Sequence, residues 1–366
     1  MNKFSVLKTN FCHSEKRTCN STVVKILTAI LLLTIIYIMF PGCGDTITEP
    51  ESGRRDYTWK VDTLNAPYSN SSYDAVIWGS SASDVWLIYY DMVYSEGAGY
   101  YKNSIWHYDG ASWKTSSIGF TEYPLSMWGT ASNNIWLTGS SNEIWHYDGN
   151  NWERNFIVDI PGGYDRVELT RVWGRSENDV WVVGYFHGSN IDFKSVILHY
   201  SKGKWQIMNT PEIKTMFYGI CRQESTGTYY ITSYNVENGD IINRIFTYDG
   251  KNTIKELFHN EYGLHYMNGE VYFEKDKKFY KYKHNRLELF RNLSGTAYVS
   301  GMIGRNENDF FCTSTGTSNL LHYDGNSVET VYQGAFFPIH GIVFEKDVFF
   351  AMYGSNKTLI LHGELK

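Results

Sequence analysis

Short apolar runs alternate with polar, turn-forming residues along most of this chain. Residues 77–86 read IWGSSASDVW, in which an apolar run, a polar turn and a second apolar run follow each other. Residues 105–110 read IWHYDG and end in Asp-Gly. Asp-Gly between apolar runs is a strong hairpin signal, because both residues tolerate positive φ. The pattern therefore predicts short antiparallel strands joined by tight turns.

Both of these phrases recur along the chain, and such self-similarity is the signature of a repeat architecture. The first phrase is clearest as VWGRSENDVW, and its copies stand at 77–86, 127–136, 172–181 and 302–311. The second phrase has copies at 105–110, 144–149, 197–205, 245–252, 320–326 and 359–364. Weaker copies of the two phrases fill the gaps at 218–232, 264–273, 278–285 and 341–350.

The recurring phrases define seven units, which begin near residues 77, 127, 172, 219, 264, 302 and 341. Each unit spans about 40–50 residues, which is the period of four-stranded propeller blades. Within a unit, strand a ends in Trp-Gly and a polar turn leads to strand b. A variable loop leads on to strand c, and Asp-Gly turns the chain into strand d. We therefore predict an all-β fold, a seven-bladed β-propeller over residues 57–366.

The two ends of the repeat region predict how the ring closes. The last unit stops after its strand c, at LILHGELK, and so lacks a strand d. Residues 57–64, YTWKVDTL, belong to no unit and look like the strand d at 111–118, ASWKTSSI. We expect residues 57–64 to complete the seventh blade, which removes the exposed edge of an open array. All twelve Trp fall on repeat positions, which predicts that they pack blade against blade.

The VWGxSxxDVW and ILHYDGxxW phrases resemble the tandem units of bacterial secreted and lipoprotein β-propeller repeat proteins. The resemblance covers about residues 57–366 and implies the propeller architecture. It implies little about activity, because propellers host many unrelated functions. The units lack the Gly-His and Trp-Asp of WD40 repeats, and their adjacent Asp and Gly differ from the sialidase Asp-box.

The N-terminus has the pattern of an export signal. Residues 26–40, ILTAILLLTIIYIMF, carry no charge and follow Lys16, Arg17 and Lys25. A positive segment followed by about 7–15 apolar residues is typical of a signal peptide, which takes no part in the fold.

Cys43 follows this apolar segment, in FPGCGD. The arrangement resembles a bacterial lipoprotein signal, in which a Cys after small residues is lipidated and becomes the mature N-terminus. That resemblance implies a signal peptide over residues 1–42, lipidation of Cys43 and a polar tether over 43–56. An uncleaved membrane anchor and plain secretion stay open as alternatives. All three place the propeller outside the cytoplasm, and the first two make the membrane a partner, in the periplasm or at the cell surface.

Charge and cysteine content exclude some classes of partner and site. The formal net charge is −6, and residues 1–42 carry five positive charges against one negative, so the remainder holds about −10. Nucleic acid needs Lys/Arg clusters, and none appears, so we expect no nucleic-acid partner. Beyond Cys43 the chain holds Cys221 and Cys312 and no CxxC spacing, which indicates neither a disulfide framework nor a zinc site.

His and Asp recur at fixed positions of the repeat. Equivalent positions on separate blades lie far apart, so the imidazoles cannot share one metal ion. We interpret the His side chains as structural and the Asp side chains as turn residues, and we expect no metal ion and no cofactor. These residues are His107, His146, His199, His322 and His362, and Asp84, Asp179, Asp309 and Asp347.

The most irregular connections join strands b and c, at 89–103, 185–195 and 234–240. In a four-stranded meander the b–c and d–a connections share one face, so this variation locates a candidate binding face. The first connection is rich in Tyr, and exposed aromatic side chains are enriched at interfaces and stack on sugars. The alternative is that these residues extend a long b–c hairpin. The predicted binding residues are Tyr89, Tyr90, Tyr94, Tyr100 and Tyr101.

These observations favour a surface-anchored, non-enzymatic binding or scaffold module of the cell envelope. It would recognise a protein or a glycan through the face that carries the b–c loops. The sequence contains no HExxH, GxSxG, P-loop or GxGxxG motif, and no catalytic residue is assigned. An extracellular glycan hydrolase or lyase with a site in the central funnel is the alternative, since propeller enzymes collect their acids from separate blades. A passive assembly component, with the ring as scaffold only, is a third hypothesis.

Overall fold

A computed structural model of the chain describes residues 51–64, 72–95, 98–116, 123–189, 192–298, 300–313, 318–353 and 358–366. The chain forms two units, Met1–Glu49 and Pro50–Lys366, and the described residues all belong to the second. The predicted signal peptide, Cys43 and the first part of the predicted tether lie outside the described residues. No helix of the described residues is long and apolar enough to span a bilayer.

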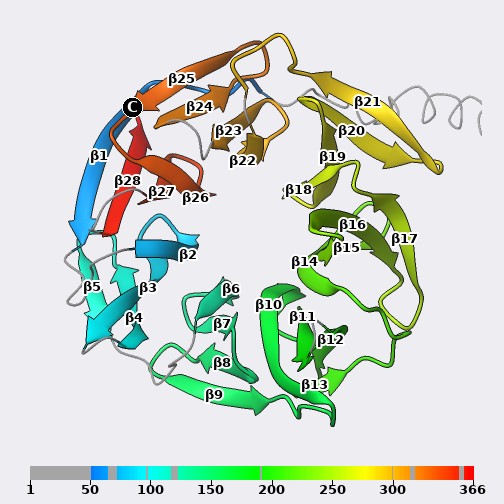
Figure 1. Ribbon diagram of the computed structural model, residues 1–366. Helices are drawn as coiled ribbons and strands as arrows, with labels where there is room; N and C mark the ends of the chain where they lie inside the picture. Colours follow the sequence, from blue (N-terminus) through cyan, green and yellow to red (C-terminus); the bar gives the residue numbers. More distant parts are fainter. Residues whose placement is uncertain are drawn as a thin grey trace, which may run out of the picture. The chain divides into compact units, whose positions relative to one another are not determined.

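The elements of the described residues are strands, and they form seven four-stranded antiparallel sheets arranged in a ring (Figure 1). The predicted fold, a seven-bladed β-propeller, is therefore confirmed. The first three blades follow the chain order from the innermost to the outermost strand. Blade 1 contains β2 (Ser72–Ser81), β3 (Asp84–Ser95), β4 (Ala98–Tyr108) and β5 (Trp113–Ser116). Blade 2 contains β6 (Pro124–Ala131), β7 (Asn134–Gly139), β8 (Glu143–Tyr147) and β9 (Trp152–Ile157). Blade 3 contains β10 (Tyr164–Ser176), β11 (Asp179–Gly188), β12 (Phe193–Ser201) and β13 (Lys204–Ile207).

The next three blades repeat the same order. Blade 4 contains β14 (Met216–Arg222), β15 (Tyr229–Glu237), β16 (Asp240–Tyr248) and β17 (Ile254–His259). Blade 5 contains β18 (Gly263–Met267), β19 (Glu270–Lys275), β20 (Lys278–Lys283) and β21 (Arg286–Asn292). Blade 6 contains β22 (Ser300–Asn306), β23 (Asp309–Thr313), β24 (Asn319–Tyr323) and β25 (Val328–Gln333). The weak fourth and fifth sequence units are thus full blades.

Blade 7 joins the two ends of the described chain. It contains β26 (Phe337–Val343), β27 (Asp347–Tyr353), β28 (Thr358–Leu365) and, as its outermost strand, β1 (Tyr57–Leu64). β1 pairs with β28 along its whole length, from Tyr57 opposite Leu365 to Leu64 opposite Thr358. This confirms the predicted closure of the ring by residues 57–64.

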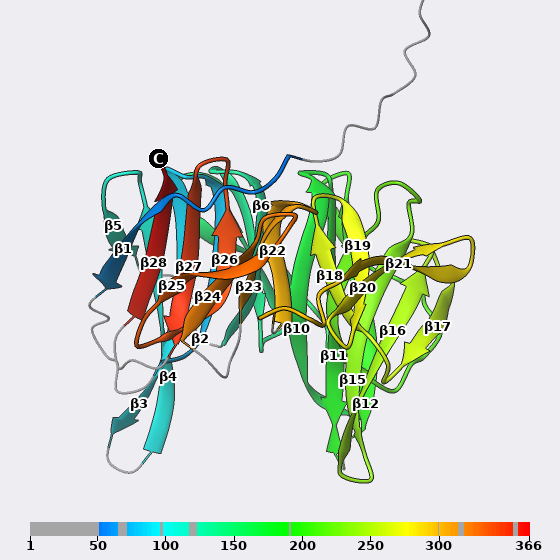
Figure 2. The ribbon, with the colours of Figure 1, turned by 90° about the horizontal axis from the view of Figure 1, so that it is seen from above.

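The two faces of the ring differ in what they carry (Figure 2). We call the face with the b–c and d–a connections the b–c face, and the face with the a–b and c–d turns the turn face. The β3–β4 hairpin projects from the b–c face, whereas the segment that leads into β1 lies at the turn face (Figure 2).

Residues 53–56, which we call the N-terminal arm, dock on blade 6 at the turn face. The Gly53 N–H donates to the carbonyls of Asn308, at 2.9 Å, and Asp324, at 3.2 Å, in the a–b and c–d turns of that blade. The Arg55 guanidinium pairs with Asp324 at 2.8 Å and with Glu329 at 3.1 Å. The predicted tether over 43–56 is therefore too long, because its last residues bind the propeller.

Apolar side chains from neighbouring blades make up the core. In one cluster Trp136 and Val158 of the blade 2 region pack with Val172 and Val182 of blade 3, all 2% exposed or less. In another, Trp181 of blade 3 packs with Ile231 of blade 4. This agrees with the prediction that the repeated Trp pack blade against blade.

The Trp-Gly pair that ends strand a has a direct physical reason. A Cβ on Gly174 of blade 3 would stand 2.6 Å from the Trp128 indole of blade 2, and one on Gly129 would stand 2.8 Å from Trp78 of blade 1. Each Gly thus leaves the space that the Trp of the preceding blade fills. The repeat contains Trp-Gly because the Trp packs at the interface with the following blade and the Gly makes room for the Trp of the preceding blade.

We predict that Gly174→Ala destabilises the protein by about 1–3 kcal/mol, because the added methyl overpacks the interface between blades 2 and 3. The measurement is the shift in the urea midpoint and in the melting temperature. Gly162→Ala is the matched control, since a Cβ there would meet no atom within 4 Å. Equal stability of the two variants would contradict this account of the Trp-Gly pair.

Candidate functional site

The repeated His and Asp side chains bond to each other within single blades. Asp lies at the start of strand b and His on strand c, so the pair links the two central strands of a blade. The Nε2–Oδ1 distances are 2.7 Å for His107–Asp84, 2.9 Å for His199–Asp179, 2.7 Å for His322–Asp309 and 2.8 Å for His362–Asp347. The structural interpretation of these His residues agrees with this geometry.

The strand-b Trp completes the network in blades 1 and 3. The Trp181 indole N–H donates to Asp179 Oδ1 at 2.8 Å, and the ring stacks on His199 with centroids 3.8 Å apart. Trp86 makes the same bond to Asp84 at 2.9 Å. These Asp residues stand at the predicted turn-to-strand junctions. Their carboxylates also hold an indole and an imidazole in place, which the turn interpretation did not include.

Blade 2 carries a neutral version of this network. Asn134 takes the place of the Asp, and its Oδ1 lies 2.8 Å from His146 Nε2. The Trp136 indole N–H is buried and has no hydrogen-bond partner in the structure. Burial lowers the pKa of His146, which favours its neutral form. The amide therefore holds the imidazole but leaves the indole unbonded.

The aspartates of the Asp-Gly turns act through the backbone instead. Asp249 Oδ1 accepts the N–H groups of Lys251, Asn252 and Thr253 at 2.9–3.0 Å. These bonds, that of Thr253 first, lower the pKa of Asp249 to about 2. Asp148 accepts two backbone N–H groups in the same way, and its pKa is also lowered. Such turns stabilise the carboxylate in its ionised form.

The predicted tyrosines lie on the β3–β4 hairpin. Tyr89 is 3% exposed and belongs to the core cluster between blades 1 and 7. It is thus a core residue, which corrects its prediction as a surface binding residue. The backbone follows the alternative considered above, a long b–c hairpin, with Val93 opposite Tyr100 and Tyr94 opposite Gly99. The side chains of Tyr90, Tyr94, Tyr100 and Tyr101 lie outside what the structure describes, so binding by them stays a prediction.

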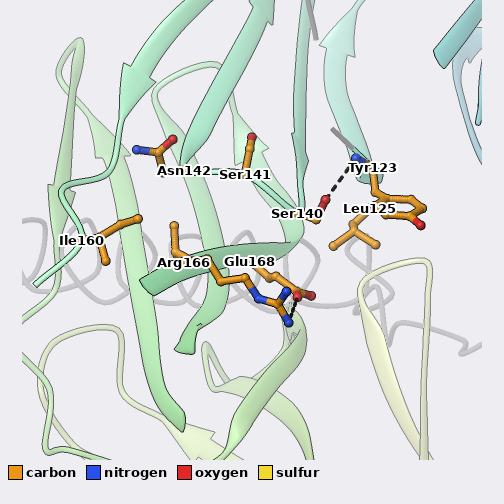
Figure 3. Close-up of a pocket in the computed structure, with 9 residues that line it drawn as sticks. Tyr123, Leu125, Ser140, Ser141, Asn142, Ile160, Arg166 and Glu168 are labelled. Carbon is orange, nitrogen blue, oxygen red and sulfur yellow. Dashed lines mark hydrogen bonds and ion pairs between the residues drawn. The ribbon is translucent and has the colours of Figure 1, made fainter. Parts of the chain in front are cut away.

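A groove of about 740 Å³ lies on the b–c face between blades 2 and 3 (Figure 3). The short b–c turn of blade 2 forms one wall, with Ser140, Ser141 and Asn142, and β10 forms the other. Leu125 and Ile160, 37% and 36% exposed, add apolar surface. The groove thus offers hydroxyl and amide groups beside apolar side chains.

Two charged side chains of β10 lie in this groove (Figure 3). Arg166 Nη2 and Glu168 Oε1 are 3.7 Å apart. The Tyr185 hydroxyl donates to Glu168 Oε2 at 2.7 Å. Burial and this bond raise the pKa of Tyr185, so the hydroxyl keeps its proton and holds the carboxylate in place. The Arg166 side chain is 60% exposed and available to a ligand.

Two further hollows open on the same face. One, of about 480 Å³ between blades 4 and 5, has Tyr218, which is 58% exposed, together with Tyr262, Asn243 and Asn260 in its walls. The other, of about 510 Å³, is lined by the b–c hairpin of blade 3 and by the connection to blade 4. Sequence reasoning missed these hollows, because it looked for long loops, whereas the groove between blades 2 and 3 lies beside a short turn. The shortness of the SSN turn at 140–142 was the one available signal.

The central channel of the ring is the remaining candidate for a ligand site. It has a volume of about 520 Å³ and is lined by innermost strands of the blades. The described residues that line it include Arg171 and His340 but no Asp or Glu. Elsewhere in the described residues, no three His, Cys, Asp or Glu side chains are grouped so that they could hold a metal ion.

The sequence matches no protein-family model and no curated protein. Its fold is similar to solved propellers of low sequence identity. A structure of YCF48 bound to D1 peptide is 16% identical and covers 86% of this chain and 100% of its own, with a TM-score of 0.56. The WD40 propeller domain of Doa1 is 10% identical, over 85% of this chain and 98% of its own, with a TM-score of 0.54. Pyrococcus horikoshii acylaminoacyl peptidase is 12% identical, over 81% of this chain and 52% of its own, with a TM-score of 0.53. At these identities the likeness shows the fold alone.

We predict that Asp179→Ala costs about 2 kcal/mol of stability, because it leaves the indole of Trp181 and the imidazole of His199 without their acceptor. Urea unfolding measures the effect. Asp179→Asn is expected to cost less, since Asn134 bonds His146 at the same position of blade 2. An Asp179→Ala variant as stable as the wild type would show that the network is dispensable.

The pKa of Asp249 predicts a pH dependence. The folded-state pKa lies below the ordinary value of 3.8, so its bonds stabilise the fold above that value, and this stability is lost as the pH falls toward about 2. Asp249→Ala should therefore lower the melting temperature at neutral pH, and the difference from the wild type should shrink in acid. A difference that stays constant between about pH 6 and pH 2 would contradict the argument.

Proposed function

We propose that this protein is a non-enzymatic binding module of the bacterial cell envelope, anchored through its N-terminus, that recognises a protein or a glycan with its b–c face. The observation that carries the proposal is the placement of three hollows on that one face, between blades 2 and 3, beside blade 3, and between blades 4 and 5. Ligand sites are concave and combine apolar walls with a few placed polar groups. The groove of Arg166 and Glu168 has this composition.

The N-terminal arm leaves the proposed binding face uncovered. Gly53 and Arg55 bind the turns of blade 6, so the first described residues of the chain lie at the turn face. The lipoprotein signal and the repeat resemblance support the proposed anchoring.

The chemistry of the grooves suits a polar chain molecule. The groove between blades 2 and 3 offers a guanidinium, a carboxylate, an amide and hydroxyls. The groove between blades 4 and 5 adds the exposed ring of Tyr218 and the half-buried ring of Tyr262. Peptides and glycans both use such groups. The similar YCF48 propeller was solved with a bound peptide, which illustrates binding as one use of this fold.

The second candidate, a glycan hydrolase or lyase in the central funnel, has less support. Glycosidic cleavage needs a pair of carboxylates. The described residues of the channel wall supply none. The third hypothesis, a scaffold that binds no ligand, does not account for the hollows of the b–c face.

The test is in-cell cross-linking of the full chain, with mass spectrometry of captured proteins and a glycan array on the solubilised protein. Arg166→Glu should weaken capture about tenfold or more, because it places a like charge beside Glu168 in the groove. A variant with Tyr94, Tyr100 and Tyr101 changed to Ser tests the hairpin tyrosines. Unchanged melting temperatures show that the variants are folded.

Arg286→Glu is the matched control, since Arg286 is a 73% exposed side chain that pairs with Glu288 beside the c–d turn of blade 5, at the turn face. Loss of the partner with the b–c face variants and not with Arg286→Glu supports the proposal. Capture that no b–c face variant changes, or no partner and no glycan above background, would refute it.

A further inference from the structure

The central channel has features that the proposed b–c face does not explain. Its walls come from β2, β6, β10, β18, β22 and β26, which surround the axis of the ring (Figure 1). Its volume of about 520 Å³ lies in the range of small-molecule sites. The lining includes apolar side chains, among them Trp78, Trp128, Trp173, Ile303 and Ile342, beside polar groups that expose nearly as much surface.

Arg171 brings a positive charge into this channel. Its side chain is exposed to the channel space. Among the described arginines it stands apart. The others each bond or pair with another described residue, as Arg305 does with Asp309 and Arg291 with Asn308. No hydrogen bond and no ion pair joins the Arg171 guanidinium to any residue that the structure describes.

The backbone holds Arg171 firmly from both sides. The Thr170 hydroxyl lies 2.8 Å from the Phe217 carbonyl of blade 4 and 3.0 Å from the Val183 carbonyl of its own blade. The Val172 N–H donates to Ser126 Oγ of blade 2 at 3.1 Å. The register of β10 against β11 also shifts between Glu168 and Arg171, and such bulges re-aim side chains beside functional sites. These contacts fix the backbone from which the Arg171 side chain extends into the channel.

Among the described residues, no Asp or Glu compensates the charge of Arg171 in the channel. Protein packed around it lowers its pKa, yet an Arg stays protonated in proteins. The ionisable neighbour that acts on it is the Cys221 thiol, whose own pKa burial raises to about 12, so that thiol is neutral. Because the side chain is exposed to the channel, a bound anion can reach the guanidinium and supply a charged partner.

We propose that the channel binds a ligand with a carboxylate and an apolar body, in which Arg171 holds the carboxylate and the half-buried side chains of Trp78, Trp128, Ile303 and Ile342 contact the body. A guanidinium matches a carboxylate with two parallel hydrogen bonds. One guanidinium balances one negative charge, whereas a phosphate dianion would keep an unbalanced charge among apolar side chains. The carboxylate belongs either to a free organic acid or to the C-terminus of a polypeptide. This site adjoins the groove between blades 2 and 3 at Leu125, but Arg171 lines the channel and not the groove.

The test uses the detergent-solubilised full chain and four probes. These are 3-phenylpropanoate and its neutral amide, and acetyl-Gly-Gly-Leu with a free or an amidated C-terminus. Tryptophan fluorescence reports binding, because Trp78, Trp128 and Trp173 line the channel, and calorimetry gives the affinity. We expect the acids to bind about tenfold or more tightly than the amides. Preference for the peptide acid would identify a C-terminus as the source, and preference for phenylpropanoate a free acid.

Arg171→Met should abolish the preference for acids while it keeps the apolar volume of the channel. Arg171→Gln serves as the second variant if the Met variant melts early, and Arg286→Met, at the turn face, is the control that keeps the preference. Equal binding of acids and amides to the wild type would overturn the proposal. So would no binding of any probe, or a preference that survives in both Arg171 variants. Because the probes are small and Arg171 lies outside the grooves, this result is independent of the partner capture at the b–c face.

Discussion

The pairing of β1 with β28 is the constraint on which the rest of the ring depends. A row of blades in an open array would expose an unpaired edge and an apolar blade face at each end. Here β1 contributes to both interfaces of blade 7. Tyr57 packs with Phe311 of blade 6, and Leu64 packs with Val85 and Leu87 of blade 1. The same strand is continuous with the N-terminal arm, so one short segment both closes the ring and docks on the turn face of blade 6.

Within the closed ring, the repeated residues serve the scaffold. The Trp of one strand a fills the space that a Gly of the next blade leaves, and Asp or Asn at the start of strand b holds His on strand c. The features that distinguish one blade from another lie at positions where the repeat pattern is not kept. The groove between blades 2 and 3 forms where a short turn stands beside longer connections. Arg171 gives the innermost strand β10 a positive charge, whereas the equivalent residue of blade 1 is the uncharged Val76. A binding role at those places therefore rests on departures from the repeat.

The sequence predicted the scaffold more completely than it predicted the binding site. The spacing of the Trp-Gly and His-Tyr-Asp-Gly phrases predicted seven blades, and the unpaired YTWKVDTL predicted the closing strand. The assignment of Tyr89 to a binding surface was wrong. In the sequence Tyr89 stands in a variable connection, but in the structure it lies within β3 and packs in the core between blades 1 and 7. The docking of Gly53 and Arg55 on blade 6 was also missed. The sequence of a polar segment does not show whether carbonyls and carboxylates of a distant blade lie within bonding distance of it.

The sequence by itself determined the number of blades, their strand order and the closure of the ring. These follow from local signals, because turn residues and the alternation of apolar positions act over a few neighbours and the chain repeats them. The tertiary structure alone decided where hollows form and which charges lack partners. Arg166 and Arg171 are five positions apart on β10, yet one meets Glu168 in a groove and the other faces the channel without an ion pair to any described residue. That difference depends on what distant blades bring within a few ångströms, and no local pattern in the chain encodes it.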